Sequence, residues 1–156
     1  MKNTKNDVIV KNGEEFEIYH EKRSLLLGKL QKIQKKDGYI SNKKMQTIAD
    51  ELNIHPVEVF SVVSFYSFLS TKKEGRNIIR VSNCISSVMK GNKIIIREFE
   101  RRLGIKCGET TSDGKFTLEK TSCIGMCDKA PAILINEKLI GPVKKEDVSQ
   151  IIGQLM

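Results

Sequence analysis

Two cysteines, Cys123 and Cys127, lie four positions apart in the segment TSCIGMCDKAPAILIN, residues 121–136. Thiolates at this spacing can bind one metal ion, and soft sulfur ligands favour zinc, copper(I) and iron–sulfur centres. Gly125 between them permits a sharp turn, and Pro131 stiffens the exit of the loop. Because a metal ion rarely has only two protein ligands, the rest of the chain has to supply further donors.

The chain has two further cysteines, Cys84 and Cys107. A tetrahedral zinc site built from all four cysteines is one interpretation, although Cys107 belongs to no second pair with metal-ligand spacing. The N-terminal sequence lacks the continuous apolar segment of a secretory signal. We therefore expect a cytoplasmic protein, whose cysteines are free or metal-bound because thiols are kept reduced in that compartment.

The segments around the cysteine pair have the pattern of a compact α/β domain. Residues 77–82 predict a strand, residues 92–103 a helix, and residues 115–120 a second strand that leads directly into the cysteine loop. Apolar stretches on either side of Asn136 predict a hairpin, and a final helix begins near Lys145. The cysteine loop is thus expected at the end of a strand.

The first part of the chain has a different, helical pattern. Apolar positions with helical spacing predict three helices, over residues 16–36, 42–52 and 56–69. Ser41 or Asn42 can cap the second helix, and Pro56 suits the first turn of the third. We therefore predict an α+β chain with an N-terminal helical bundle in residues 1–74 and an α/β domain in residues 75–156.

The charge of the chain is not arranged as in a nucleic-acid-binding arm. The net charge of +8 comes from 14 basic and 10 acidic residues in 1–78, and 13 and 9 in 79–156. The segment 45–59 is similar to a helix-turn-helix, so a DNA-binding protein is an alternative, but the next residues are aromatics and serines rather than base-reading side chains. The apolar run 59–69 is too short to span a bilayer. We predict no nucleic-acid partner and no direct membrane insertion.

Several longer motifs occur in one order along nearly the whole chain. They are LLLGKLQKIQKKDGYIS (25–41), IADELNIHPVEVFSVVSFYSFLS (48–70), IIRVS (78–82), LGIKCGETTSDGKFTLEKTSCIGMCDKAPAILIN (103–136) and KKEDVSQIIGQL (144–155). Together they resemble the thioredoxin-like 2Fe-2S ferredoxin subunits of NADH-oxidising modules. Such subunits occur in respiratory complex I, NAD-linked and electron-bifurcating hydrogenases, and formate dehydrogenases. The resemblance implies a thioredoxin-like fold for residues 75–156.

The resemblance also implies a metal site, from which this sequence departs. The family has a Cys-x4-Cys pair directly after the first strand of the domain, and those positions fall on Ser82 and Ser87 here. Only the second pair, Cys123 and Cys127, is retained. Cys84 lies two residues beyond the first ligand position. Since four thiolates hold the two irons of such a cluster, the chain lacks two of them.

Three outcomes are open for this site. The first is that no cluster binds and the chain has a structural role. The second is that Ser82 and Ser87 bind iron as alkoxides, although a hydroxyl is far less acidic than a thiol and oxygen suits iron–sulfur chemistry poorly. In the third, Cys84 replaces one lost ligand. Losing two of four ligands favours the first outcome, so we expect a degenerate 2Fe-2S site, with a functional carrier that has non-standard ligands as the alternative.

The resemblance places the remaining cofactors on another chain. It implies an accessory electron-transfer-type subunit whose partner is a flavin- and NAD(P)-binding iron–sulfur subunit of the same complex, with FMN and NAD(P) bound there. The sequence itself contains no P-loop and no Gly-x-Gly-x-x-Gly motif. We therefore expect a non-catalytic subunit of an NAD(P)-linked oxidoreductase. His20 and His55 are not expected to be metal ligands.

Overall fold

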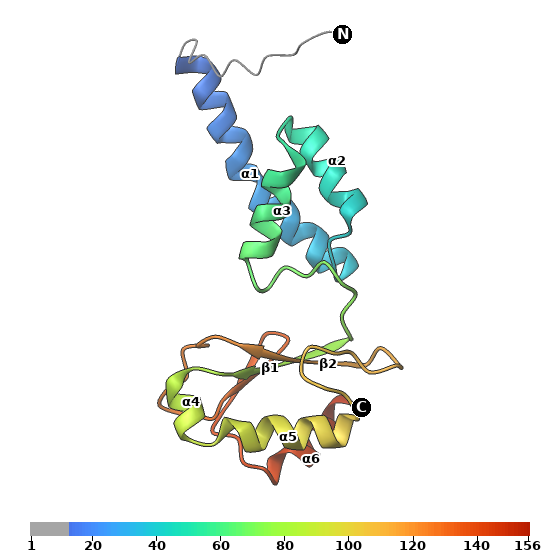
Figure 1. Ribbon diagram of the computed structural model, residues 1–156, viewed down its shortest axis with the longest axis vertical. Helices are drawn as coiled ribbons and strands as arrows, with labels where there is room; N and C mark the ends of the chain where they lie inside the picture. Colours follow the sequence, from blue (N-terminus) through green and yellow to red (C-terminus); the bar gives the residue numbers. More distant parts are fainter. Residues whose placement is uncertain (1–12) are drawn as a thin grey trace. The chain divides into compact units, whose positions relative to one another are not determined.

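The computed structural model describes the backbone of residues 13–156 and the side chains from residue 23 onward (Figure 1). His20, which is not expected to be a metal ligand, and the start of the predicted helix at residues 16–36 therefore lie outside the described side chains. Contacts between residues divide the chain into two compact units, Met1–Lys72 and Lys73–Met156. We call them the helical unit and the sheet unit and describe each separately.

The helical unit contains three helices, α1 (Gly13–Asp37), α2 (Asn42–Leu52) and α3 (Pro56–Phe65). Apolar side chains of all three helices and their connections share one core, formed by Leu26, Leu30, Ile40, Met45, Ile48, Ala49, Leu52, Ile54, Val59 and Val63. The ends of the helices follow from local chemistry. Ser41 caps α2 by accepting a hydrogen bond from the Lys44 N–H, and Asn53 ends it in a left-handed conformation with φ of 51°.

The third helix is shorter than the sequence predicts. It was expected to continue to Leu69, but it ends at Phe65, because Tyr66 has an extended backbone with φ of −86° and ψ of 105°. The aromatic run beyond this point does not enter the core, since Phe65 is 79% exposed and Phe68 is also exposed. Helices in proteins depend on the burial of an apolar face, so an unburied aromatic run does not extend this one.

The sheet unit contains a four-stranded mixed sheet. Its strands are β1 (Asn77–Ser82), β2 (Phe116–Thr121), β3 (Ile133–Ile135) and β4 (Lys138–Ile140), in the spatial order β2-β1-β3-β4. The strands β1 and β2 are parallel, whereas β3 is antiparallel to both β1 and β4. The predicted strand at residues 77–82 matches β1, and Asn136, with φ of 52°, lies in the turn of the predicted hairpin.

Two helices cover one face of this sheet, α5 (Asn92–Leu103) and α6 (Asp147–Leu155) (Figure 1). The core between helices and sheet is formed by Ile79, Val81, Ile95, Ile96, Phe99, Phe116, Leu118, Ile133, Ile135, Val143, Val148 and Ile151. The predicted helix at residues 92–103 has the bounds of α5. A further short helix, α4 (Ile85–Met89), was not predicted. It follows β1 directly and carries part of the candidate site.

Candidate metal centre

The candidate site lies where the two parallel strands of the sheet end. Ser82, the last residue of β1, is opposite Thr121, the last residue of β2. Because parallel strands present their carboxyl ends at one edge of a sheet, the segments that follow them leave from the same place. We call residues 83–91 the first loop and residues 122–132 the second loop. This topology brings together cysteines that are about forty residues apart in sequence.

The first loop is fixed by buried hydrogen bonds at its base. The Ser82 N–H donates to the Ala132 carbonyl at 3.0 Å, and the Asn83 N–H donates to the Thr121 carbonyl at 2.8 Å. Asn92, which is fully buried at the start of α5, donates from Nδ2 to the Ser82 carbonyl at 2.9 Å and to Asn83 Oδ1 at 3.0 Å. Hydrogen bonds with Ala132, Thr121 and Asn92 therefore fix the backbone at Ser82 and Asn83.

Cys84 lies between the two serines that occupy the family's ligand positions. Ser82 and Ser87 are almost fully buried, with exposed fractions of 2% and 1%. Ser82 Oγ donates to Cys84 Sγ at 3.5 Å, and Cys84 Sγ donates to Ser87 Oγ at 3.5 Å. Cys84 is the N-cap residue of α4, and its carbonyl accepts the Val88 N–H at 3.0 Å. The helix thus fixes the backbone on the C-terminal side of Cys84, and β1 ends two residues before it.

The second loop presents its two cysteines toward each other and toward solvent. The Sγ atoms of Cys123 and Cys127 are 3.3 Å apart, and both residues are exposed. Gly125 has φ of 80° between them, and its N–H donates to Cys123 Sγ at 3.5 Å. A Cβ at this glycine would meet nothing within 4 Å. Glycine is therefore required by the backbone conformation and not by lack of space.

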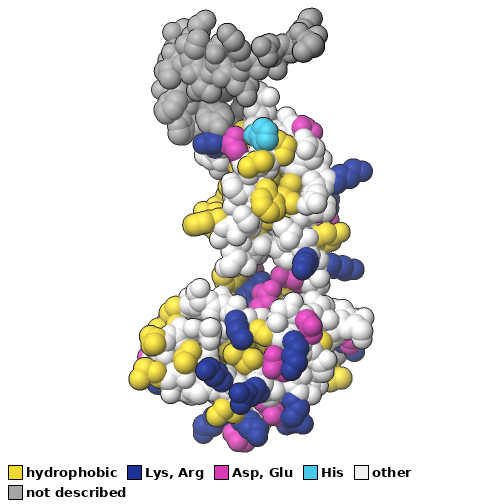
Figure 2. Space-filling view, in the orientation of Figure 1, with side chains coloured by type: hydrophobic (Ala, Val, Ile, Leu, Met, Phe, Trp, Pro, Cys, Tyr) yellow, Lys and Arg dark blue, Asp and Glu magenta, His cyan; other side chains and the backbone are white. Residues whose placement is uncertain are grey.

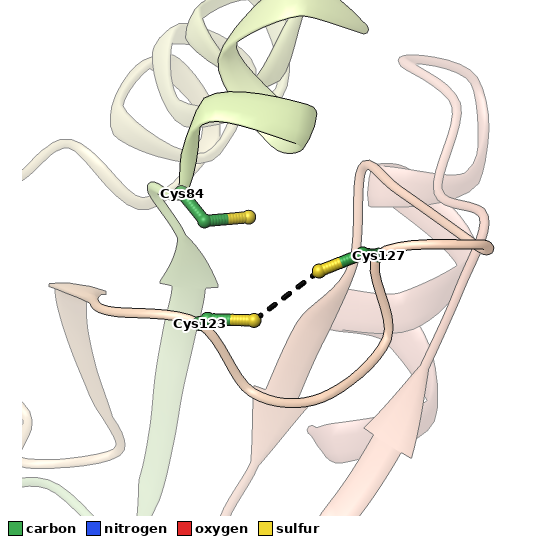
Figure 3. Close-up of side chains that lie close together, drawn as sticks. All are labelled: Cys84, Cys123 and Cys127. Atoms are coloured by element: carbon green, nitrogen blue, oxygen red, sulfur yellow. Dashed lines mark hydrogen bonds between the residues drawn. The ribbon is translucent and has the colours of Figure 1, made fainter.

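The two loops are joined by side chains of the first that donate to carbonyls of the second. Ser86 Oγ donates to the Cys127 carbonyl at 3.0 Å, and Lys90 Nζ donates to the Asp128 carbonyl at 3.3 Å. The sulfurs of Cys84, Cys123 and Cys127 point toward one another from the two loops (Figure 3), and all three lie within 4.8 Å of one another. The fold thus creates a three-sulfur cluster that the sequence spacing alone does not show.

The pKa of Cys84 in the first loop and that of Cys127 in the second loop are shifted in opposite directions. Hydrogen bonds with the Ser82 and Ser87 side chains lower the pKa of Cys84 to about 6, because they stabilise the thiolate. In the second loop, the hydrogen bond to Cys123 and the charge of that neighbour raise the pKa of Cys127 to about 11. Thiolates at these distances repel one another, and a bound cation would offset this repulsion.

The other sequence candidates lie apart from this cluster. Cys107 packs against the core of the sheet unit, where burial raises its pKa, and its N–H donates to Glu100 Oε1 at 3.1 Å. It is not a member of the three-sulfur cluster, so the structure does not bring together the four cysteines of the zinc site considered from sequence. His55 caps α3 by accepting the Val57 N–H at Nδ1, 3.3 Å away.

The fold and the site together define a class of protein. A mixed sheet with helices on one face carries cysteine-bearing loops at the end of its parallel strands, and residues 13–156 match the family model of the thioredoxin-like [2Fe-2S] ferredoxins. The chain belongs to this family, which confirms the recognition made from the motifs. It also gives the sheet unit a thioredoxin-like fold.

Within the family, the chain is similar to the E subunit of NADH-quinone oxidoreductase. It is 38% identical over 134 residues to this protein from Buchnera aphidicola subsp. Acyrthosiphon pisum, covering 86% of this chain and 83% of the relative. It is 33% identical over 138 residues to the relative of the same name from Escherichia coli K12, covering 88% and 83% of the two chains. The predicted relationship to NADH dehydrogenase subunits is therefore confirmed.

A solved structure with the same fold comes from a larger protein. A chain of the NAD+-reducing [NiFe]-hydrogenase in the air-oxidised state matches with a TM-score of 0.70 and 22% identity. The match covers 84% of this chain but only 22% of the hydrogenase chain. The present fold thus corresponds to about a fifth of that polypeptide.

The donors of this chain fit the family's cluster only with a changed ligand set. A [2Fe-2S] cluster takes four protein ligands, which are cysteines in most proteins. The three cysteines supply three of them, and the buried hydroxyls of Ser82 and Ser87, each 3.5 Å from Cys84 Sγ, are candidate further donors. When bound, such a cluster supplies one-electron transfer.

Sequence reasoning did not identify two residues that organise this site, Asn92 and Ser86. Asn92 looks like an ordinary first residue of a helix, and only its full burial shows that it holds the base of the first loop. Ser86 bridges to the second loop through a backbone carbonyl, which carries no sequence signal. Among the described helices, none has the length and apolar composition needed to cross a lipid bilayer.

Proposed function

We propose that this chain is an accessory, electron-transfer-type subunit of a multi-subunit NAD(P)H-linked flavin and iron–sulfur oxidoreductase. The observation that carries the proposal is that the similarity to the NADH-quinone oxidoreductase relative from Buchnera spans 86% of this chain, while the family match covers residues 13–156 and so includes helices of both units. A similarity limited to the sheet unit would point only to a ferredoxin. The helical unit is thus part of what the chain shares with a subunit of a complex.

The domain organisation follows the change in pattern along the sequence. We assign residues 1–74 to an N-terminal helical bundle and residues 75–156 to the thioredoxin-like ferredoxin domain. Two separate apolar cores support this assignment, and so does the division of contacts between Lys72 and Lys73.

The partner in this proposal is a subunit that carries FMN, NAD(P) and further iron–sulfur centres. The helical unit has an apolar surface suited to such a contact, with exposed Val57, Phe60, Phe65, Tyr66 and Phe68. Aromatic residues are enriched in the buried centres of protein interfaces, and clustered exposed apolar residues mark interaction sites. The sheet unit has basic and acidic side chains interspersed on the face shown in Figure 2, without a basic stripe of the kind that binds nucleic acid.

Hydride transfer belongs to the partner in this proposal, and the role of the chain in the complex does not depend on a bound cluster. A subunit that buries apolar surface stays necessary for assembly even if its own redox centre is lost. This is the mainly structural role expected from the sequence. The alternative, a working electron carrier with non-standard ligands, depends on the donors of the first loop.

The test is purification of the complex through an affinity tag on the full chain, expressed in its natural host. We expect a flavoprotein to co-purify, with FMN absorbance and NADH-dependent reduction of an artificial acceptor. A monomer without flavin, or specific binding to DNA, would contradict the proposal. The double variant Phe60→Asp/Phe65→Asp should lose the flavoprotein, whereas Leu139→Asp, at an exposed residue of β4, should retain it.

A further inference from the structure

We propose that Cys84 is the third thiolate ligand of a [2Fe-2S] centre in this chain, and that the fourth ligand is the oxygen of Ser82 or Ser87. The inference rests on the proposed function and takes up its alternative, a working electron carrier with non-standard ligands. Cys84 lies at neither of the family's ligand positions, so this set differs from the one that the family resemblance implies.

The donors within each loop lie at separations that suit one metal ion. Two thiolates bound to one tetrahedral ion at about 2.3 Å lie about 3.8 Å apart, and a thiolate and an oxygen bound at about 2.3 and 2.0 Å lie about 3.5 Å apart. The Sγ atoms of Cys123 and Cys127 are 3.3 Å apart. Cys84 Sγ is 3.5 Å from each serine oxygen. Each loop therefore holds a pair of donors that fits one iron.

The two pairs of donors also face each other. The three sulfurs are within 4.8 Å of one another although they come from loops after different strands. Hydrogen bonds from Ser86 and Lys90 to backbone carbonyls keep the loops together. A two-iron centre needs one pair of ligands on each side, and the site provides one pair from each loop. Sulfurs bound to different irons lie farther apart than these three do, so the Cys84 side chain has to move away from the second loop when the cluster binds.

Sulfur and oxygen differ as ligands in a way that favours a role for Cys84. Thiolates are the preferred ligands of iron–sulfur clusters, and a serine hydroxyl loses its proton far less readily than a thiol. A set with Cys84 needs only one serine oxygen, whereas a set without it needs two. With one serine bound to iron, the other hydroxyl is left to donate to the Cys84 sulfur, as groups around a metal site commonly do for its ligands.

The burial of the first loop makes this arrangement specific. Ser82 and Ser87 are almost fully buried, and Asn92 holds the backbone of Ser82. These contacts fix the two hydroxyls on either side of Cys84 instead of leaving them to solvent. An oxygen ligand in this position is shielded from water, which would otherwise compete for the iron.

The test is cluster reconstitution of the full chain under anaerobic conditions with ferrous iron and sulfide. We expect about two irons and two sulfides per chain, with charge-transfer absorption in the visible range and an EPR signal after reduction. Cys84→Ala should reduce bound iron at least tenfold. The matched control Cys107→Ala, which removes a cysteine outside the site, should retain the iron of the unmodified chain.

A rescue variant separates a ligand role from a folding role. Ser82→Cys/Ser87→Cys restores the two cysteine positions of the family, so adding Cys84→Ala to this background should leave the iron content unchanged. The double variant Ser82→Ala/Ser87→Ala should lose iron, since it removes both candidate oxygens. Circular dichroism and urea unfolding of each variant show whether it is folded.

Several results would overturn the inference. They are full iron content in Cys84→Ala, absence of iron from the reconstituted unmodified chain, and one zinc per chain without sulfide. Failure of the proposed function is distinguishable, because it concerns co-purification with a flavoprotein. If Cys84→Ala loses iron but still recovers the flavoprotein, both proposals stand. If iron binds normally but no flavoprotein is recovered, only the proposed function fails.

Discussion

The two loops of the candidate site differ in how they hold their chemical groups. The first loop has a hydrogen-bonded, buried base and, together with Ser82 at the end of β1, places one cysteine between two serines, whereas the second is exposed and carries two cysteines. The loop whose backbone is held by more buried hydrogen bonds is thus the one with fewer thiols. The backbone of a loop and its donor atoms are therefore separate properties, because the hydrogen bonds of the first loop form here without the family's two cysteines.

The largest expected difference between the loops is in thiol reactivity. In the metal-free chain, alkylation of Cys84 should rise with a midpoint near pH 6, its pKa in the folded protein, and become constant above pH 7. Cys127, with a pKa of about 11, should continue to gain reactivity with pH across this range. At pH 6 the thiolate fractions favour Cys84, and after allowing for its weaker nucleophilicity we expect a rate ratio on the order of 100-fold.

Mass spectrometry of peptides after timed treatment with iodoacetamide measures both rates in one sample. Ser82→Ala/Ser87→Ala should move the midpoint for Cys84 upward, toward the value of an ordinary thiol, because it removes the hydrogen bonds that stabilise the thiolate. Equal alkylation rates for Cys84 and Cys127 from pH 5 to 8 would contradict the difference in pKa between the two thiols.

The next largest effect concerns the scaffold of the first loop. Asn92→Ala should lower the free energy of unfolding by about 2 kcal/mol, because it removes the two hydrogen bonds that hold Ser82 and Asn83. Urea denaturation followed by circular dichroism measures the loss. Asn42 is the exposed first residue of α2, as Asn92 is the buried first residue of α5, so Asn42→Ala should change stability by less than about 0.5 kcal/mol. Equal effects of the two substitutions would show that burial of Asn92 is not the cause.

A smaller effect is expected in the backbone of the second loop. Gly125→Ala should cost about 1 kcal/mol, since φ of 80° is unfavourable for a residue with a Cβ and no steric clash adds to the cost. Gly153→Ala in α6 is the control with the opposite sign, with an expected gain of about 0.5 kcal/mol from helix propensity. Thermal unfolding of the pair measures both, and a gain in stability for Gly125→Ala would contradict the assigned turn.

The smallest effect is expected for the exposed cysteines themselves. Cys123→Ala should change the stability of the metal-free chain by less than about 0.5 kcal/mol, because the residue is exposed and outside the apolar core. The same denaturation measurement applies. A loss above about 1 kcal/mol would mean that the second loop contributes to folding, and the contrast between the loops would then be weaker than we describe.

The sequence predicted the regular elements of the sheet unit well, because local chemistry determines them. The strand at 77–82 and the helix at 92–103 have clear apolar periodicity, and both occur with the predicted bounds. The helix α4 was missed, since five residues are too few to show a period. The extension of α3 to Leu69 was wrong because an apolar run does not reveal whether its side chains are buried.

The candidate site was predictable only in part. The pair Cys123 and Cys127 and the family were recognised from motifs. The sequence does not show that the Cys84 sulfur contacts both serine hydroxyls and lies within 4.8 Å of the other two sulfurs. That placement depends on the turn from β1 into α4 and on the parallel pairing of β1 with β2. The pairing joins residues distant in sequence, which no spacing rule contains.

The hydrogen bonds from Ser86 and Lys90 to the second loop end on carbonyl oxygens of the main chain. Every amino acid supplies such an oxygen. The hydrogen bonds between the loops therefore do not depend on which side chains are present at residues 127 and 128. Proteins with this architecture can therefore exchange one ligand for another, or sulfur for oxygen, without losing the hydrogen bonds that join the two loops.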